Sequence, residues 1–113
     1  MKIKQFREGK AHLNKIVMKY SNKDIKKFLS LDSQIWQGNA LSTKTKELLG
    51  LVASLVLRCD DCVTYHIIHC FKEGVNNDEL ADALSIGLLI GGSVTIPGLR
   101  KAFATWDELK NVK

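Results

Sequence analysis

The segment Cys59-Asp60-Asp61-Cys62-Val63-Thr64-Tyr65-His66 constrains this chain more than any other stretch. Its two cysteines and its histidine are spaced at i, i+3 and i+7, which brings the three side chains onto one face if the segment is helical. Cys62 and His66 are then one turn apart, close enough for the ring to exchange a proton with the thiol. Two sulfurs at this spacing, at the start of a helix, can also form and reopen a disulfide. The motif therefore predicts a helix that carries thiol redox chemistry.

Helical periodicity runs through the rest of the chain, and no segment alternates between apolar and polar residues as a strand would. We expect helices from about Lys4 to Tyr20, after Ser21 as far as Gly38, from Thr43 to about Arg58, through the motif to Gly74, from about Asn77 to Ile90, and from Thr95 or Pro97 to about Leu109. The predicted fold is an all-α orthogonal bundle of about six helices. The chain contains no linker or repeat, so we predict one domain over residues 1–113.

Capping signals mark several of the helix starts. Ser21 and Ser42 are the expected N-caps of the second and third helices. Asn76 with Glu79 three residues on resembles a capping box, which predicts the start of the fifth helix.

The expected helix over 43–58 is apolar nearly all round in its second half, which predicts the central buried helix of the bundle. Glu47 lies at the start of that apolar run. It is either a first-turn carboxylate near solvent or a partly buried group, and the composition leaves both open. In the fifth helix, Gly87 and Gly91 share a face on which another helix can approach closely.

Positive charge is concentrated in residues 1–27, which carry nine basic and two acidic residues, while the remainder is slightly acidic. A basic arm can bind nucleic acid or an anionic surface. In this stretch, however, apolar residues recur at helical spacing and leave the lysines on the opposite face; they are Ile3, Phe6, Leu13, Ile16, Val17 and Tyr20. No nucleic-acid motif accompanies them. We therefore predict a solvated helix face and no nucleic-acid partner.

The first residues of the chain and its one long uncharged stretch indicate the cellular compartment. Residues 1–7 are charged and contain no apolar core of a signal peptide. The stretch from Ala83 to Leu99 is short for a membrane span and is broken by Gly91-Gly92 and Pro97-Gly98. We expect a cytoplasmic protein with no membrane partner. In a reducing compartment, a Cys-x-x-Cys pair is more often catalytic or metal-binding than a permanent cross-link.

Two opposing influences act on the thiols of the motif. Only the thiolate attacks peroxides or disulfides. The N-terminus of a helix and a neighbouring imidazole favour deprotonation, whereas Asp60 and Asp61 oppose a further negative charge. The sequence does not decide between them.

Simpler interpretations of these residues remain open. The cysteines could be half of a zinc site completed by His66, His69 or Cys70, or two inert buried thiols. We expect no metal, because no second Cys-x-x-Cys is present. His69 and Cys70 are interpreted as packing residues and His12 as a surface residue. The aromatic residues Trp36, Tyr65 and Trp106 are expected in the core or at a subunit interface.

Three segments together resemble a known family; they run from Leu41 to Leu48, from Arg58 to His66, and from Glu73 to Leu80. They are similar to the carboxymuconolactone decarboxylase superfamily, and within it to the alkylhydroperoxidase D-like branch. The similarity covers about residues 22–110 and leaves the basic N-terminal helix of residues 1–20 outside. That branch has a Glu, a Cys-x-x-Cys twelve residues later, and a His four residues after the second Cys. Glu47, Cys59, Cys62 and His66 match those positions.

The resemblance implies a helical subunit that assembles into trimers or hexamers and a peroxidase or disulfide reductase that needs no cofactor beyond a Cys59–Cys62 disulfide. By position, Cys62 would attack the peroxide, Cys59 would resolve the product, His66 would shuttle protons and Glu47 would support it; the reverse order of the cysteines is also possible. The substrate would be a small hydroperoxide or disulfide, and the reductant a dithiol. Relatives in this branch often have a histidine just before the second cysteine, where this chain has Asp61.

Two other functions compete with this one. The first is a non-redox binding or assembly module that has kept the fold. The second is a lyase without a cofactor that acts on a lactone or carboxylate, with His66 or His69 as its acid and base. The decarboxylases of the superfamily lack the cysteine pair, so its presence argues against lyase activity.

Overall fold

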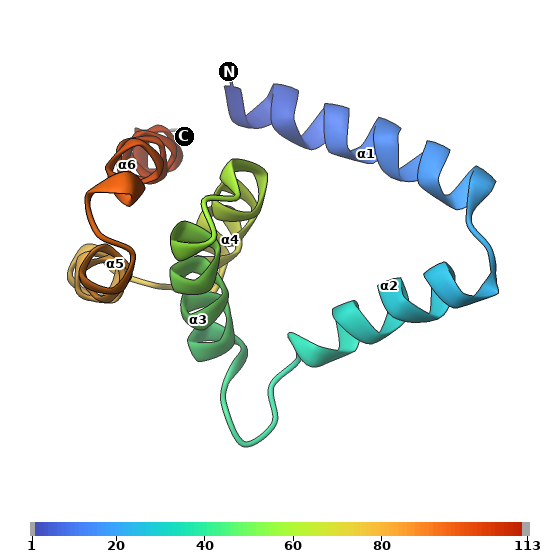
Figure 1. Cartoon of the computed structure of the whole chain (residues 1–113), viewed down its shortest axis with the longest axis horizontal. Helices are drawn as coiled ribbons and strands as arrows, with labels where there is room; N and C mark the ends of the chain where they lie inside the picture. The colour runs from blue at the N-terminus through green and yellow to red at the C-terminus, as the bar shows by residue number, and fades with distance from the viewer. Residues whose placement is uncertain (1, 112–113) are drawn as a thin grey trace. The chain divides into compact units, whose positions relative to one another are not determined.

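The structure is a computed structural model that describes residues 2–111 of the chain (Figure 1). It contains α1 (Lys2–Tyr20), α2 (Lys23–Ile35), α3 (Thr43–Val56), α4 (Asp60–Lys72), α5 (Asn77–Gly91), the short 3₁₀ helix η1 (Ser93–Thr95) and α6 (Ile96–Asn111). No strand occurs within residues 2–111. The predicted all-α fold with six α-helices is confirmed, while η1 had no signal that we recognised in the sequence.

Contacts divide the chain into two compact units, one ending at Gln37 and the other starting at Gly38. The first unit comprises α1 and α2, and the second comprises α3 to α6 with η1. That the whole chain forms one domain stays a prediction.

The first unit is a pair of amphipathic helices with almost no core of its own. No residue of α2 is buried, and in α1 only Ile3 is. His12 is exposed, as expected. The large apolar side chains exposed on this unit are Leu13, Ile16, Val17, Met18, Tyr20, Ile25, Phe28, Leu29, Leu31 and Ile35. Helices of 19 and 13 residues with so little burial gain little from tertiary packing within the unit.

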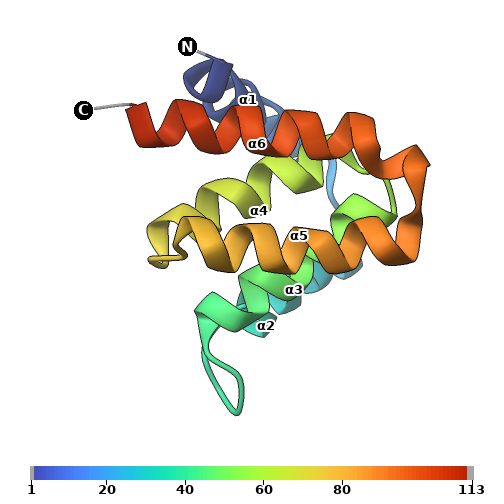
Figure 2. The ribbon, with the colours of Figure 1, turned by 90° about the vertical axis from the view of Figure 1, so that its left-hand side faces the viewer.

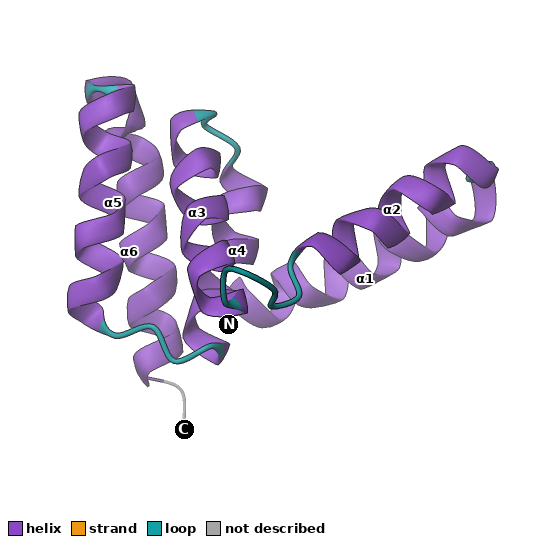
Figure 3. Cartoon of the chain, turned by 90° about the horizontal axis from the view of Figure 1, so that it is seen from below, coloured by secondary structure: helices purple, strands orange, loops and turns teal. Residues whose placement is uncertain are grey.

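The second unit contains the hydrophobic core. Helix α3 packs against both α4 and α5, and α4 packs against α6 (Figures 2 and 3). The largest fully buried apolar side chains of this core are Leu51, Leu55, Ile67, Leu80 and Leu84. Burying each of them contributes roughly 1.5–3 kcal/mol before the entropy of ordering is counted. This core fixes the register between α3 and α4, the two helices on which the expected site residues lie.

The close approach of α3 and α5 depends on a glycine, as predicted. A Cβ atom at Gly87 would lie 2.9 Å from Leu55 Cδ2 on α3. The predicted central buried helix is covered only in part, because Leu49 of α3 is 55% exposed whereas Leu51 and Leu55 are buried. Helix α3 is central to the second unit, but only one side of it is covered within the unit.

Most of the expected caps are present. Ser42 accepts a hydrogen bond from the Thr45 N–H at 3.1 Å, and Asn76 and Glu79 form a reciprocal capping box. Ser21 was the wrong N-cap for α2: its hydroxyl donates to the carbonyl of Val17, in the last turn of α1. Asn22 has the extended backbone of an N-cap and accepts from the Ile25 N–H instead.

Within the described residues, no helix is both long enough and apolar enough to cross a bilayer.

Candidate active site

The connection between α3 and α4 has only three residues, Leu57 to Cys59. Helix α3 ends in a Schellman motif, in which the Arg58 N–H bonds to the Leu55 carbonyl and the Cys59 N–H to the Ser54 carbonyl. Arg58 has φ of +58°, in the left-handed region that favours glycine. Helix α4 ends in the same way at Gly74, with φ of +82°. Cys59, the first cysteine of the motif, is therefore the last residue whose N–H bonds to a carbonyl of α3.

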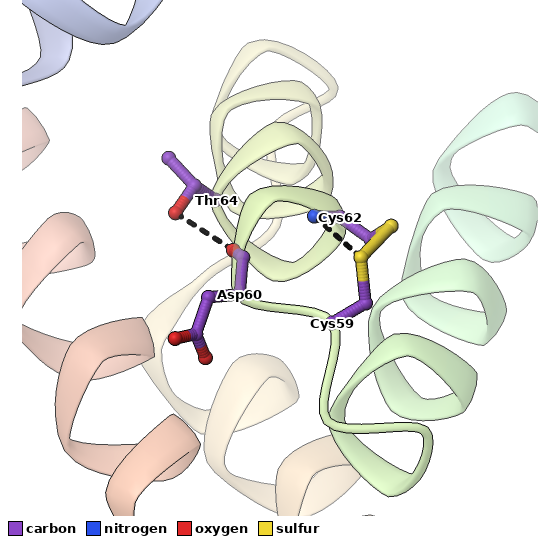
Figure 4. Close-up of a disulfide and its surroundings, with 4 residues drawn as sticks. All are labelled: Cys59, Asp60, Cys62 and Thr64. Atoms are coloured by element: carbon purple, nitrogen blue, oxygen red, sulfur yellow. Dashed lines mark hydrogen bonds between the residues drawn. A yellow bond between two sulfur atoms is a disulfide. The ribbon is translucent and has the colours of Figure 1, made fainter.

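Cys59 is also the N-cap of α4. Its backbone is extended, with φ of −94° and ψ of 97°, and its sulfur accepts a hydrogen bond from the Cys62 N–H at 3.3 Å (Figure 4). The pair lies at the start of a helix, as expected: Cys59 precedes α4 as its cap, and Cys62 lies in the first turn. The two residues form a disulfide with a Cα–Cα separation of 5.2 Å, in the usual range for such bonds. Cys62 is exposed and Cys59 is partly exposed, so solvent reaches this pair.

One turn further along α4, His66 is buried and faces α3. Its Nδ1 lies 2.8 Å from Oε1 of Glu47, whose side chain is only 2% exposed. The open question about Glu47 is thereby answered in favour of the buried alternative. An ionised carboxylate only accepts hydrogen bonds. With Glu47 ionised, Nδ1 of His66 carries the proton and donates a hydrogen bond to the carboxylate. That tautomer makes Nε2 the basic nitrogen of the ring.

The first turn of α4 contains two aspartates, one of which forms an ion pair with α6. Asp60 Oδ2 lies 2.5 Å from Nζ of Lys101, and the Asp60 carbonyl accepts from the Thr64 hydroxyl at 3.1 Å. Figure 4 shows the Asp60 carboxylate on the side of the helix start opposite the sulfurs. Lys101 was absent from our expected site, because 41 residues separate it from Asp60 and no local pattern links them.

The third cysteine is not part of the reactive pair. Cys70 is fully buried on the inner side of α4. Burial, with a smaller contribution from the negative charge of Glu47, raises the pKa of the Cys70 thiol to about 12. The interpretation of Cys70 as a packing residue is confirmed.

Of the remaining candidates, Tyr65 and His69 lie on α4 and Trp106 packs against it. The rings of Tyr65 and His69 lie 4.2 Å apart between centroids, and Tyr65 meets His66 edge-on at 5.2 Å. Trp106 is buried, as expected for a core aromatic, and donates to Asn77 Oδ1 at 2.8 Å. Trp36 is half-buried. Among residues 2–111 no three His, Cys, Asp or Glu side chains converge as a metal site would require.

The four expected site residues thus fall into two adjoining pairs. The structure joins Cys59 to Cys62 and pairs Glu47 with His66, and both pairs involve α4. The catalytic roles of these residues stay predictions. The arrangement provides an accessible disulfide and, one turn away, an imidazole oriented by a buried carboxylate.

Comparison with known proteins places the chain among helical relatives. A family model described as the carboxymuconolactone decarboxylase family matches residues 26–108. Two crystal structures of a Thermotoga maritima protein are 46% and 45% identical, with TM-scores of 0.92 and 0.90. The first covers 95% of this chain and 94% of that one, and the second covers 94% and 90%. The Thermotoga protein is described as a member of this family with a suggested involvement in antioxidative response.

Two more distant relatives agree on the fold or the family. The apo structure of a family member from Legionella pneumophila is 21% identical, has a TM-score of 0.85, and covers 95% of this chain and 96% of that one, which shows a shared fold. The 4-carboxymuconolactone decarboxylase of Acinetobacter baylyi is 28% identical over 80 residues. That match spans 67% of this chain and 60% of the enzyme.

Proposed function

The chain belongs to the carboxymuconolactone decarboxylase family, and from that premise we propose that it is a thiol-dependent peroxidase or disulfide reductase with Cys59 and Cys62 as its redox centre. One observation carries the proposal: an accessible pair of cysteines within bonding distance lies one helical turn from a buried histidine that contacts a buried glutamate. The alkylhydroperoxidase D-like spacing of these residues and the antioxidative description of the Thermotoga relative also support it.

The oxidative half of the proposed reaction consumes one hydroperoxide. The Cys62 thiolate attacks one peroxide oxygen, an S–O bond forms, the O–O bond breaks, and the leaving alkoxide takes a proton to become an alcohol. Cys59 then attacks the sulfur of the Cys62 sulfenic acid, and the S–S bond forms as hydroxide leaves and is protonated to water. Two electrons have passed from the cysteine pair to the peroxide.

The reductive half requires an external dithiol. Its thiolate attacks the Cys59–Cys62 disulfide, and a mixed disulfide forms and is resolved by the second thiol of the donor. The donor leaves as a disulfide and the pair regains two electrons and two protons. If the reduced pair attacks a substrate disulfide in place of a peroxide, it passes its two electrons to that disulfide, and the protein operates as a disulfide reductase.

Exposure and geometry favour Cys62 as the attacking thiol. Cys62 is the more exposed of the two and precedes His66 by one turn. Cys59 accepts the N–H at the start of α4, which stabilises a negative sulfur when Cys59 leaves during exchange. His66, with Nδ1 engaged by Glu47, is suited to take and return protons through Nε2.

The remaining expectations become part of the proposal. The protein would need no cofactor, because both electrons reside in the cysteine pair. It would act in the cytoplasm, where dithiol reductants are available. It would assemble as a homotrimer or homohexamer, which would cover apolar side chains now exposed on both units, including Phe28, Leu89 and Ile90.

A thiol count tests the redox function directly. The reduced, folded protein should lose two free thiols on addition of one equivalent of an alkyl hydroperoxide, and mass spectrometry should find Cys59 linked to Cys62. Cys59→Ser and Cys62→Ser should each abolish turnover, while Cys70→Ser, the matched control, should retain it. Turnover retained in both site variants would refute the proposal.

The same experiment separates the alternatives. A lyase would tolerate both Cys→Ser substitutions and leave peroxide unchanged. A non-redox module would keep all its thiols after the peroxide is added. Assembly is measured by light scattering, where three or six times the chain mass of 12.6 kDa is expected and a monomer would contradict the proposed oligomer.

A further inference from the structure

The first turn of α4 presents an electrostatic difficulty for the proposed chemistry. Attack by a cysteine requires its thiolate, yet Asp60 and Asp61 immediately follow Cys59. A carboxylate next to a forming thiolate raises the thiol pKa, because two negative charges repel. Arg58, Asp60 and Asp61 are the charged residues next to the pair in the sequence. Two ion pairs involve α4: His66 with Glu47 of α3, and Asp60 with Lys101 of α6.

One of these groups reaches the helix start from a distant element. Lys101 lies on α6, and its ammonium contacts the Asp60 carboxylate. The carboxylate points toward α6 and away from the disulfide (Figure 4). Both side chains are more than half exposed, at 63% for Lys101 and 53% for Asp60. Such an exposed pair adds little to fold stability.

We propose that Lys101 is a positioning residue for the redox pair: it holds the Asp60 carboxylate on the far side of the α4 start and offsets its charge, so that a thiolate forms more readily. Lys101 touches neither sulfur and acts through Asp60. This inference rests on the proposed function for its significance, but it concerns only the acidity of the thiols. It can therefore be tested without any turnover.

The magnitude follows from the size of surface charge effects. Removing Lys101 leaves the negative charge of Asp60 without its offset. At a solvated surface, one such charge several ångströms away raises the pKa of a thiol by about 0.5 unit. Lys101→Met should therefore raise the lower of the two thiol pKa values by about 0.5 unit. Well below that pKa, the thiolate fraction and the rate of alkylation should fall about threefold.

The test uses the reduced, folded, full-length protein. Iodoacetamide alkylation is followed against pH, and mass spectrometry assigns the reaction to Cys59 or Cys62. Lys101→Arg should restore the wild-type rate, because it keeps the charge and the contact. Lys110→Met is the matched control: it removes the same charge from α6 nine residues further on, where Lys110 lies 5.6 Å from the Trp106 ring centroid, and it should leave the rate unchanged.

A double-mutant cycle with Asp60→Asn shows whether Lys101 acts through Asp60. In the Asp60→Asn background, Lys101→Met should change the alkylation rate by less than about 1.5-fold. An unchanged thiol pKa in Lys101→Met, or an equal effect in both backgrounds, would overturn the inference. If the protein consumes no peroxide but Lys101→Met slows alkylation as expected, the proposed function fails while this inference stands.

Discussion

Cys70 should be almost inert toward thiol reagents as long as the protein is folded. Burial, and then the charge of Glu47, raises its pKa from the ordinary 9.0 to about 12. A shift of three pKa units reduces the thiolate fraction at pH 8 about 1000-fold, and the thiolate is the species that is alkylated. The side chain is also fully buried, which restricts access of the reagent further.

The assay is alkylation of reduced protein at pH 8, with each cysteine quantified by peptide mass spectrometry. The folded protein should show two reactive thiols, Cys59 and Cys62, and a third that reacts at least 100-fold more slowly than it does in denaturing urea. The sample in urea is the control, because all three thiols are accessible there. Modification of Cys70 in the folded protein within tenfold of its rate in urea would refute the assignment.

Three further predictions concern the scaffold. Arg58 and Gly74 both have positive φ, which glycine adopts at the lowest cost. In urea denaturation, Arg58→Gly should therefore stabilise the protein by about 0.5–1 kcal/mol and Gly74→Ala should destabilise it by about 1 kcal/mol. A loss of stability in Arg58→Gly would contradict this. Gly87→Val should cost about 2 kcal/mol through its clash with α3, while Ala81→Val on the exposed side of the same helix should cost well under 1 kcal/mol, and equal costs would count against the close approach. The capping-box hydrogen bond holds the pKa of Glu79 below its ordinary 4.5. The stabilisation by its carboxylate is therefore present above pH 4.5 and is lost as the pH falls through the pKa of the folded state. Thermal melts of wild type and Glu79→Gln should differ at pH 7 and converge near pH 3.

Local chemistry predicted most of the helix boundaries. Ser42, Gly74 and the Asn76 capping box each act within one turn of the chain, so their roles can be inferred from neighbouring residues. Ser21 and Asn22 are both good N-caps, and the choice between them depends on the end of α1, where the Ser21 hydroxyl finds a carbonyl. The error was therefore one residue in position and none in helix type.

Features that depend on tertiary contacts were less predictable. The family resemblance implied that Glu47 supports His66, but the burial of Glu47 follows from how α3 packs on α4. Nothing in the sequence marks Arg58 for a left-handed conformation, because the position usually calls for glycine. Lys101 reaches Asp60 only through the packing of α6 on α4. The motif indicated which cysteines come together, and the fold supplies their electrostatic environment.

The three-residue junction between α3 and α4 limits how this protein can change. The Cys59 N–H donates to a carbonyl of α3, and the Cys59 sulfur accepts from an N–H of α4. Hydrogen bonds therefore fix the junction to both helices. A helix turns by about 100° per residue, and one inserted residue would swing His66 away from Glu47 and the cysteine pair out of line with both. We expect the junction to accept a different side chain at Arg58 but not a different length. For this site, the number of residues in the junction is therefore a stricter requirement than the identity of the side chain at position 58.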